Sequence, residues 1–200
     1  MARTRDEGRD RKEAIVAAAG DVFLRYGFKK TSMDDLARAA DLSRQGLDLH
    51  FPSKEQLFVA VVHHFVATTQ AGYAAALARS DTDTATRLIG ALEAFHGHAA
   101  GLSIEAQMNE LLEVAARLVG DVVPQLEQSI VADLAKVLEK SGVARAWKPA
   151  RIGAAELAAN LYATSVGLKH RVKSFAEFHD RLTLAVRITL AGAVPVPRAK

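Results

Sequence analysis

A short stretch in the first third of the chain carries side chains that can hydrogen-bond to the edges of nucleic-acid bases. It reads SRQGLDLHFPSKE and spans residues 43–55. Arg44 can reach guanine or phosphate, and Gln45 can pair with adenine. The carboxylate of Asp48 can accept a hydrogen bond from the amino group of cytosine. The stretch therefore has the chemistry of a base-reading surface, provided that other elements hold it outward.

The same stretch predicts a helix that is too short to stand alone. Ser43 is a good N-cap, and Pro52 ends the helix. Leu47 and Phe51 are four residues apart, so they share a face and can anchor the helix to a small core. The positions that remain for DNA or solvent are Arg44, Gln45, Gly46, Asp48, Leu49 and His50.

Two helices are expected before it. Residues 10–27 have apolar side chains at helical spacing and a glycine stop. Thr31 or Ser32 can cap a second helix, whose first turn carries two aspartates. A tight turn at Asp41 then leads to the helix at 43–51. Two helices joined by a tight turn, the second short and exposed, form the helix-turn-helix pattern.

The rest of the chain predicts a larger helical bundle. Residues 54–79 predict a long helix that starts from a Ser-x-x-Gln capping box. Beyond it, we expect helices at about 84–99, 103–118, 121–141, 149–172 and 174–193. No alternating strand pattern is found. The expected fold is all-α with about nine helices. It comprises a helix-turn-helix domain over residues 1–53 and a helical bundle over residues 54–200.

Composition narrows the class of protein. The chain has 200 residues, no cysteine and a net charge of +3. The lack of cysteine excludes a disulfide scaffold and a thiolate metal site, and the basic balance is a hint of an anionic partner. The polar N-terminus has no secretory apolar region, and the apolar runs are too interrupted for a membrane span. We therefore expect a cytoplasmic protein with no membrane partner.

No motif of the sequence favours catalysis or a metal site. A nucleophile elbow, a glycine-rich phosphate loop and an H-E-x-x-H helix are all missing, so we expect neither an enzyme nor a cofactor. The histidine pairs at 63–64 and 96–98 cannot chelate one ion from a regular helix, because such neighbours do not face each other. We expect no metal site, although a site spread over several helices that includes Glu105 or Glu110 stays open.

The longer pattern resembles a known family. The stretch AIVAAAGDVFLRYGFKKTSMDDLARAADLSRQGLDLHFPSKEQLFVAVV is similar to the N-terminal domain of TetR/AcrR-family transcriptional repressors over about residues 10–62. The residues that carry the likeness are Phe23, Gly27, Thr31-Ser32, Ala37-x-x-Ala40, Ser43 and above all HFPSKEQLF. The resemblance implies an all-α homodimer that binds DNA through this domain, with a C-terminal helical domain that binds a small ligand and dimerises. No motif in residues 63–200 adds to it.

The resemblance also implies roles for single residues. Thr31 and Ser32 are expected to contact phosphates, and Lys54 resembles the family's phosphate-gripping lysine. The base-reading positions are Arg44, Gln45 and Gly46, with His50 near the DNA backbone. The chain departs from the family at two positions, since Asp41 stands where glycine is frequent and Asp48 stands where tyrosine is very common.

Asp48 leaves three interpretations open. A carboxylate is repelled by phosphates, so the residue cannot simply replace an aromatic ring on the DNA backbone. It can read a cytosine, pair with Arg44 at the i, i+4 spacing and orient it, or weaken DNA binding. The sequence does not separate these interpretations.

The C-terminal part supplies candidates for two further surfaces. Large side chains at such positions are more often plain core than the lining of a cavity. The candidates for a largely apolar effector cavity are Phe95, His96, Met108, Leu112, Trp147 and Tyr162. Residues 153–167 are dense in alanine and glycine, which lets two helices approach closely. Given the resemblance, we expect this stretch in a dimer interface with Leu157, Leu161 and Leu168, although packing within one subunit is the alternative.

These expectations combine into one hypothesis. The protein is a ligand-responsive transcriptional repressor, a homodimer that binds a pseudo-palindromic double-stranded operator through the helix at 43–51 and leaves it when a small molecule binds the bundle. The alternative is a helical small-molecule-binding or interaction protein whose DNA binding is weakened or lost, with Asp48 as the sign of that loss.

Overall fold

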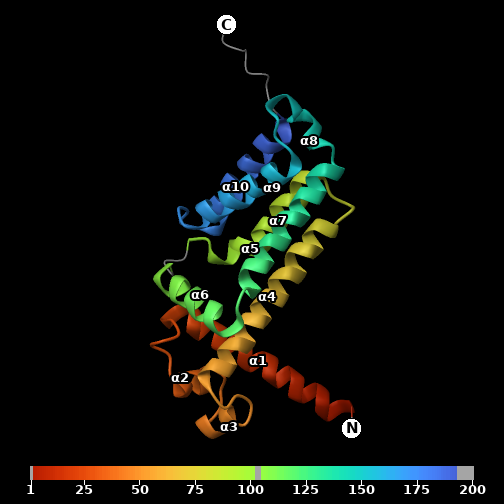
Figure 1. Ribbon diagram of the computed structural model, residues 1–200. Helices are drawn as coiled ribbons and strands as arrows, with labels where there is room; N and C mark the ends of the chain where they lie inside the picture. The colour runs from red at the N-terminus through yellow and green to blue at the C-terminus, as the bar shows by residue number, and fades with distance from the viewer. Residues whose placement is uncertain (1, 102–104, 193–200) are drawn as a thin grey trace. The chain divides into compact units, whose positions relative to one another are not determined.

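The computed structural model describes residues 2–101 and 105–192, which form ten α-helices and two short 3₁₀ helices (Figure 1). The all-α prediction is confirmed, because no strand occurs in those two ranges. Three positions at the ends of predicted helices, 103, 104 and 193, lie outside the described residues, as does the side chain of Glu105.

The helices form two compact units. The first unit comprises Met1–Thr68 with Ile104–Val123, and the second comprises Thr69–Ser103 with Pro124–Lys200. We expected a boundary after residue 53, whereas the division falls inside the long helix α4 (Lys54–Ala78). Helix α6 (Glu105–Val119) also belongs to the first unit.

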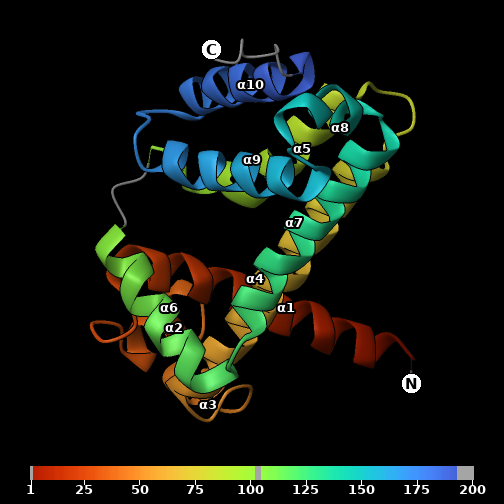
Figure 2. The ribbon, with the colours of Figure 1, turned by 45° about the horizontal axis from the view of Figure 1, so that its top comes forward.

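Helix α6 joins the first unit because its apolar face enters that unit's core. Leu111, Val114 and Ala115, at i, i+3 and i+4, are buried in the same cluster as the N-terminal helices. Helix α6 packs against α1 (Ala2–Tyr26), as Figure 2 shows. The N-terminal part of the first unit, which ends at Thr68, is therefore completed by a helix that begins 37 residues later, at Glu105.

The first unit also contains the two helices of the predicted helix-turn-helix, α2 (Met33–Ala39) and α3 (Arg44–Asp48). The side chains that hold these helices to α1 and α4 are almost fully buried; they include Ile15, Phe23, Leu36, Ala37, Leu47, Leu57 and Phe58. Helix α3 is only five residues long, so its stability comes from this packing rather than from its own hydrogen bonds.

Three phenylalanine rings lie at the centre of this core. Phe23 stacks on Phe28 with ring centroids 5.8 Å apart, and the edge of Phe58 meets Phe23 at 5.1 Å and Phe28 at 5.2 Å. The rings come from α1, from the loop after it and from α4. They therefore fix the loop that leads into α2.

Local hydrogen bonds set where α2 and α3 begin. The Ser32 hydroxyl accepts from the Asp35 N–H, and the Asp35 carboxylate accepts from the Ser32 N–H, which is a complete capping box. The Ser43 hydroxyl oxygen accepts from the Gly46 N–H at 3.0 Å. Between the two helices Asp41 has a φ of 54°, a left-handed conformation that aspartate tolerates better than most residues.

The second unit is a helical bundle. Its elements are α5 (Thr84–His96), the 3₁₀ helix η1 (Gly97–Ala99), most of α7 (Val122–Lys140), α8 (Val143–Ala146), the 3₁₀ helix η2 (Lys148–Ala150), α9 (Ala154–Lys169) and α10 (Phe175–Ala191). Helices α9 and α10 run side by side and both pack on α5 (Figure 1).

The start of α9 differs from the prediction. A helix was expected from about residue 149, but α9 begins at Ala154. The chain first makes the turns α8 and η2, and Arg151 then takes a φ of 60° that no right-handed helix allows. A four-residue helix such as α8 has too few positions for a periodic pattern to predict it.

Candidate functional site

Helix α3 presents polar and apolar side chains outward from a buried anchor. Leu47 is fully buried and Phe51 is 9% exposed, so the expected anchoring pair is confirmed. Arg44 and Gln45 are exposed, and Leu49 is 88% exposed. An outward face with a guanidinium, an amide and an isopropyl group matches the groups that read base edges in a major groove.

Arg44 and Asp48 form an ion pair across one turn of α3. The Arg44 Nε–H is 3.0 Å from each of the two carboxylate oxygens of Asp48. The structure contains the ion pair that one of the three interpretations of Asp48 requires. The pair uses Nε, so the two terminal amino groups of the guanidinium lie outside it.

The hydroxyls expected to contact phosphates are engaged locally. Thr31 is 3% exposed and its hydroxyl donates to the Gly27 carbonyl at 2.6 Å. The Ser32 hydroxyl donates to the Asp35 carboxylate at 2.5 Å. Neither side chain offers its proton to a phosphate in this conformation. Their backbone N–H groups also donate within the chain, that of Thr31 to the Phe28 carbonyl and that of Ser32 to the Asp35 carboxylate. Ser43 differs, because its oxygen accepts the capping bond and its own O–H stays available.

Lys54 holds the loop between α1 and α2. Its ammonium group donates to the Phe28 and Thr31 carbonyls, both at 2.9 Å, and lies 4.3 Å from the centroid of the Phe28 ring. The resemblance implies that Lys54 binds a phosphate, but two of the three N–H donors of its ammonium group bind the protein itself. The partners precede Lys54 by more than twenty residues, so no local pattern could predict this contact.

Lys54→Met should lower the free energy of unfolding by about 2 kcal/mol, because two carbonyls lose a charged donor at a half-buried position. Urea denaturation followed by circular dichroism measures the change. Lys30→Met is the matched control, since Lys30 is exposed in the same loop and should change stability by less than about 0.5 kcal/mol. Equal losses of stability in the two variants would contradict the role of Lys54 in holding the loop.

Glu110 of α6 contacts the same loop from another side. Its carboxylate accepts from the Lys29 backbone N–H at 2.6 Å. The carboxylate also fills the space beside Gly27, where a Cβ atom would lie 2.9 Å from Oε2. Gly27 has a φ of 81°, so both the conformation and the close approach require glycine.

Gly27→Ala is expected to lower the unfolding free energy by about 1–2 kcal/mol, through strain at positive φ and the displaced carboxylate. Gly20→Ala on α1 should do the opposite. Its Cβ would meet Val61 at an ordinary 3.6 Å, and alanine favours a helix interior by about 0.5–1 kcal/mol. Urea titrations of both variants test this, and a shift of the same sign in the two would refute it.

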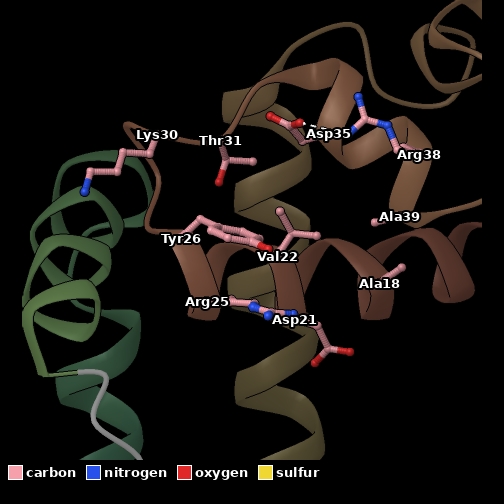
Figure 3. Close-up of a pocket in the computed structure, with 10 residues that line it drawn as sticks. All are labelled: Ala18, Asp21, Val22, Arg25, Tyr26, Lys30, Thr31, Asp35, Arg38 and Ala39. Atoms are coloured by element: carbon pink, nitrogen blue, oxygen red, sulfur yellow. Dashed lines mark hydrogen bonds and ion pairs between the residues drawn. The ribbon is translucent and has the colours of Figure 1, made fainter.

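A groove of about 600 Å³ lies between α1 and α2 (Figure 3). Its lining residues are Ala18, Asp21, Val22, Arg25, Tyr26, Lys30, Thr31, Asp35, Arg38 and Ala39. Hydrogen bonds from Ser32 lower the pKa of Asp35, which also pairs with Arg38. The groove carries charges of both signs, and it contains none of the residues predicted to bind an effector.

Three of the six predicted effector residues come together in the second unit. The Phe95 and His96 rings of α5 meet the Tyr162 ring of α9, with centroids 5.7 and 5.3 Å away, respectively. Trp147 instead donates from its indole to the Thr189 carbonyl at 2.8 Å. Met108 and Leu112 lie on α6, which belongs to the first unit.

A buried polar network crosses this aromatic cluster. The Ser165 hydroxyl donates to the Tyr162 carbonyl at 2.8 Å, so its oxygen must accept from His96 Nδ1, also at 2.8 Å. His96 therefore carries its proton on Nδ1 and can accept at Nε2. Burial, with the charge of Lys169 as the next cause, lowers the pKa of His96 to about 3. Sequence reasoning missed Ser165, because a serine among alanines gives no sign of a partner 69 residues away.

The Tyr162 hydroxyl is the most unusual atom of this network. It is buried, and no partner in the described part of the chain meets hydrogen-bond geometry. Burial, followed by the negative charge of Glu127 and a hydrogen bond to it, raises the pKa of Tyr162. The Glu127 carboxylate is therefore a nearby acceptor for this O–H, although its placement falls outside good hydrogen-bond geometry.

The leucines predicted for a dimer interface mostly face inward. Leu157 and Leu161 are 5% and 0% exposed within one protomer, and Leu168 is half-buried. Leu157 and Leu161 thus offer almost no surface to a second copy. The exposed residues of α9 include Glu156 and Asn160 and four small ones at a spacing of four, Ala155, Ala159, Ala163 and Gly167. On α10, Leu184 and Ile188 are 58% and 59% exposed.

The described residues give no sign of two other kinds of site. No group of three or more histidine, aspartate or glutamate side chains in those residues is arranged to hold a metal ion. No helix among them is both long and apolar enough to cross a membrane.

Residues 15–61 match a family model described as bacterial regulatory proteins, tetR family. The transcriptional activator FasR of Mycolicibacterium smegmatis is 38% identical over 86 residues, which are 43% of this chain and 39% of FasR. The matched stretch thus spans well under half of that relative's length.

Solved structures share the fold over most of the chain. A TetR-like transcriptional regulator from Rhodococcus sp. RHA1 is 24% identical with a TM-score of 0.64, and the alignment covers 92% of this chain and 97% of that one. AibR, solved with isovaleryl coenzyme A and operator DNA, is 17% identical with a TM-score of 0.61 over 86% and 96% of the two chains. The similarity of these structures extends well beyond the matched N-terminal residues.

Proposed function

The chain belongs, through residues 15–61, to the TetR family of bacterial regulatory proteins, and on this premise we propose that it is a ligand-responsive transcriptional repressor. It acts in the cytoplasm as a homodimer on a pseudo-palindromic operator. A small molecule that binds the second unit releases it from the DNA.

The observation that carries this proposal is the outward face of α3. Leu47 anchors the helix while Arg44, Gln45 and Leu49 face away from the core. In a dimer, two such helices enter successive major grooves about 34–36 Å apart. The ion pair between Arg44 and Asp48 also argues against the alternative that this surface has lost its function.

The second copy is proposed to dock on α9 and α10. The small residues of α9 permit close approach of two helices, and Leu184 and Ile188 supply apolar area on α10. Two helices from each copy then form a four-helix interface. This assignment uses exposed residues of α9 and α10 in place of Leu157 and Leu161, which are buried in α9.

The effector is proposed to contact the cluster of Phe95, His96 and Tyr162. The rings supply an apolar surface, Tyr162 supplies an O–H donor, and His96 supplies a neutral acceptor. A ligand with an apolar body and at least one hydrogen-bond acceptor fits this chemistry. AibR was crystallised with an acyl coenzyme A, a molecule that also carries an acyl chain and carbonyl acceptors.

Helix α4 is the element proposed to carry the signal, because residues of both units belong to it. An effector that prefers one conformer by ~100-fold in affinity shifts the equilibrium by about 2.7 kcal/mol. A shift of that size is enough to change the occupancy of an operator.

Selection of bound duplexes from a random DNA pool tests the proposal. The purified full-length protein should enrich one pseudo-palindrome and bind it with nanomolar affinity, and far more weakly when it is scrambled. The affinity should fall steeply between 50 and 200 mM salt. Light scattering should give the mass of two chains. If no sequence is enriched and all duplexes bind weakly and equally, the proposal fails in favour of a ligand-binding protein without an operator.

A further inference from the structure

The ion pair on α3 has the wrong orientation to serve helix stability. Arg44 is the first residue of the helix and Asp48 the last. A helix dipole favours an acid at the start and a base at the end, so this order is the less stable one. Exposed pairs of this kind contribute only about 0.3–0.5 kcal/mol even when well oriented. The pair therefore needs an explanation other than the stability of α3.

Pairing changes what the arginine can do. A free arginine side chain has many rotamers, and Asp48 holds this one through Nε, with both oxygens at 3.0 Å. The planar guanidinium then has a fixed edge, on which two terminal amino groups lie side by side. Two parallel donors match the N7 and O6 acceptors that guanine presents in the major groove.

The same contact limits the other roles of Asp48. Both carboxylate oxygens face the guanidinium, so the acid is already occupied as an acceptor and is less suited to the amino group of cytosine. Its negative charge is offset by Arg44, which reduces the repulsion from phosphates. Asp48 therefore fits the part of a positioning residue rather than a direct reader.

Leu49 supplies a second, chemically different contact. Its side chain is 88% exposed although it follows directly on the pair. In a major groove, the group that an apolar side chain can recognise is the methyl group of thymine. Leu49 and Arg44 lie at different angles around the helix, so they reach different base pairs.

We propose that Arg44, positioned by Asp48, reads one guanine in each operator half-site, and that Leu49 covers the methyl group of a thymine in the same half-site. The inference rests on the proposed function, since it requires an operator. It names the base features for which the reading helix is specific.

Base analogues in the selected operator test both contacts. Replacing the guanine by 7-deazaguanine removes only N7, and it should weaken wild-type binding about 10-fold or more when both half-sites are altered. Arg44→Ala should bind the normal and the altered operators equally. Replacing the thymine by uracil removes only the methyl group, and this should weaken the wild type but not Leu49→Ala.

Asp48→Asn separates positioning from repulsion. The variant should lose about 5-fold or more in preference for guanine over adenine at the Arg44 position, while its affinity for scrambled DNA stays equal or rises. A gain in affinity for all duplexes with unchanged guanine preference would instead make Asp48 a repulsive residue and overturn the proposal. The variant could instead lose its preference for a cytosine at a position where 7-deazaguanine has no effect on binding. Asp48 would then read that base directly, and this result would also overturn the proposal.

The two proposals fail in different ways. If the random pool yields no operator, the repressor assignment falls and the inference falls with it. If an operator is found but no guanine in it shows an N7 effect that depends on Arg44, the repressor assignment stands and the reading mechanism is wrong. Circular dichroism of each variant is expected to show that the exposed substitutions leave the helices intact.

Discussion

Phe23→Ala is expected to lower the free energy of unfolding of the first unit by about 3–5 kcal/mol. Phe23 is 1% exposed and touches the rings of Phe28 and Phe58, so its removal leaves a cavity between α1, α4 and the loop that leads to α2. Small domains have only about 5–15 kcal/mol of stability in all, so the loss is a large share of the total. Urea denaturation followed by circular dichroism measures it.

Tyr26→Ala is the control for this prediction. Tyr26 lies one turn further along α1 and is 49% exposed, so its truncation should change stability by no more than about 0.5 kcal/mol. Phe23→Leu, which retains part of the volume, should give an intermediate loss. A similar loss for Phe23→Ala and Tyr26→Ala would show that the aromatic cluster is not the core of this unit.

Acid is expected to destabilise the second unit through His96. Its pKa is about 3 in the folded chain, below the ordinary 6.5, because the ring is buried and Lys169, His98 and His170 add positive charge nearby. Between pH 6.5 and about 3, His96 therefore binds a proton in the unfolded chain but not in the folded chain. Stability should fall as the pH drops through this window, by about 2.5 kcal/mol between pH 7 and 4.5.

His96→Asn tests this assignment. The asparagine amide can still donate to Ser165 in place of Nδ1, but it does not titrate. The variant should be less stable at pH 7, because it loses packing, and its stability should depend less on pH. Burial also lowers the pKa of His98, so part of the acid effect should remain. Parallel pH curves for the wild type and the variant would show that His96 is not responsible.

Local patterns were sufficient to predict most of the helices, though not α8 or the start of α9, and to predict the anchoring of α3. Ser32 and Ser43 cap helices as expected, and Leu47 and Phe51 are buried as their spacing indicates. These features depend on hydrogen bonds and apolar spacing within one or two turns. A single sequence contains all of that information, and the family resemblance of residues 10–62 depends on the same local signals.

Contacts between distant residues changed several assignments. Lys54 clamps a loop more than twenty residues before it, and Glu110 reaches the same loop from α6. Of the six predicted effector residues, only Phe95, His96 and Tyr162 come together. Ser165, which no pattern singled out, completes their network.

The sequence by itself determined that this chain is all-helical, that its N-terminal part has a helix-turn-helix and that α3 carries Arg44, Gln45, Asp48 and Leu49 on its outside. Only the tertiary structure decided that Asp48 pairs with Arg44, that α6 belongs to the first unit and that Leu157 and Leu161 face the core. The physical reason is that helical periodicity shows which residues share a face. It does not show which helix that face meets, nor which rotamer a long charged side chain adopts.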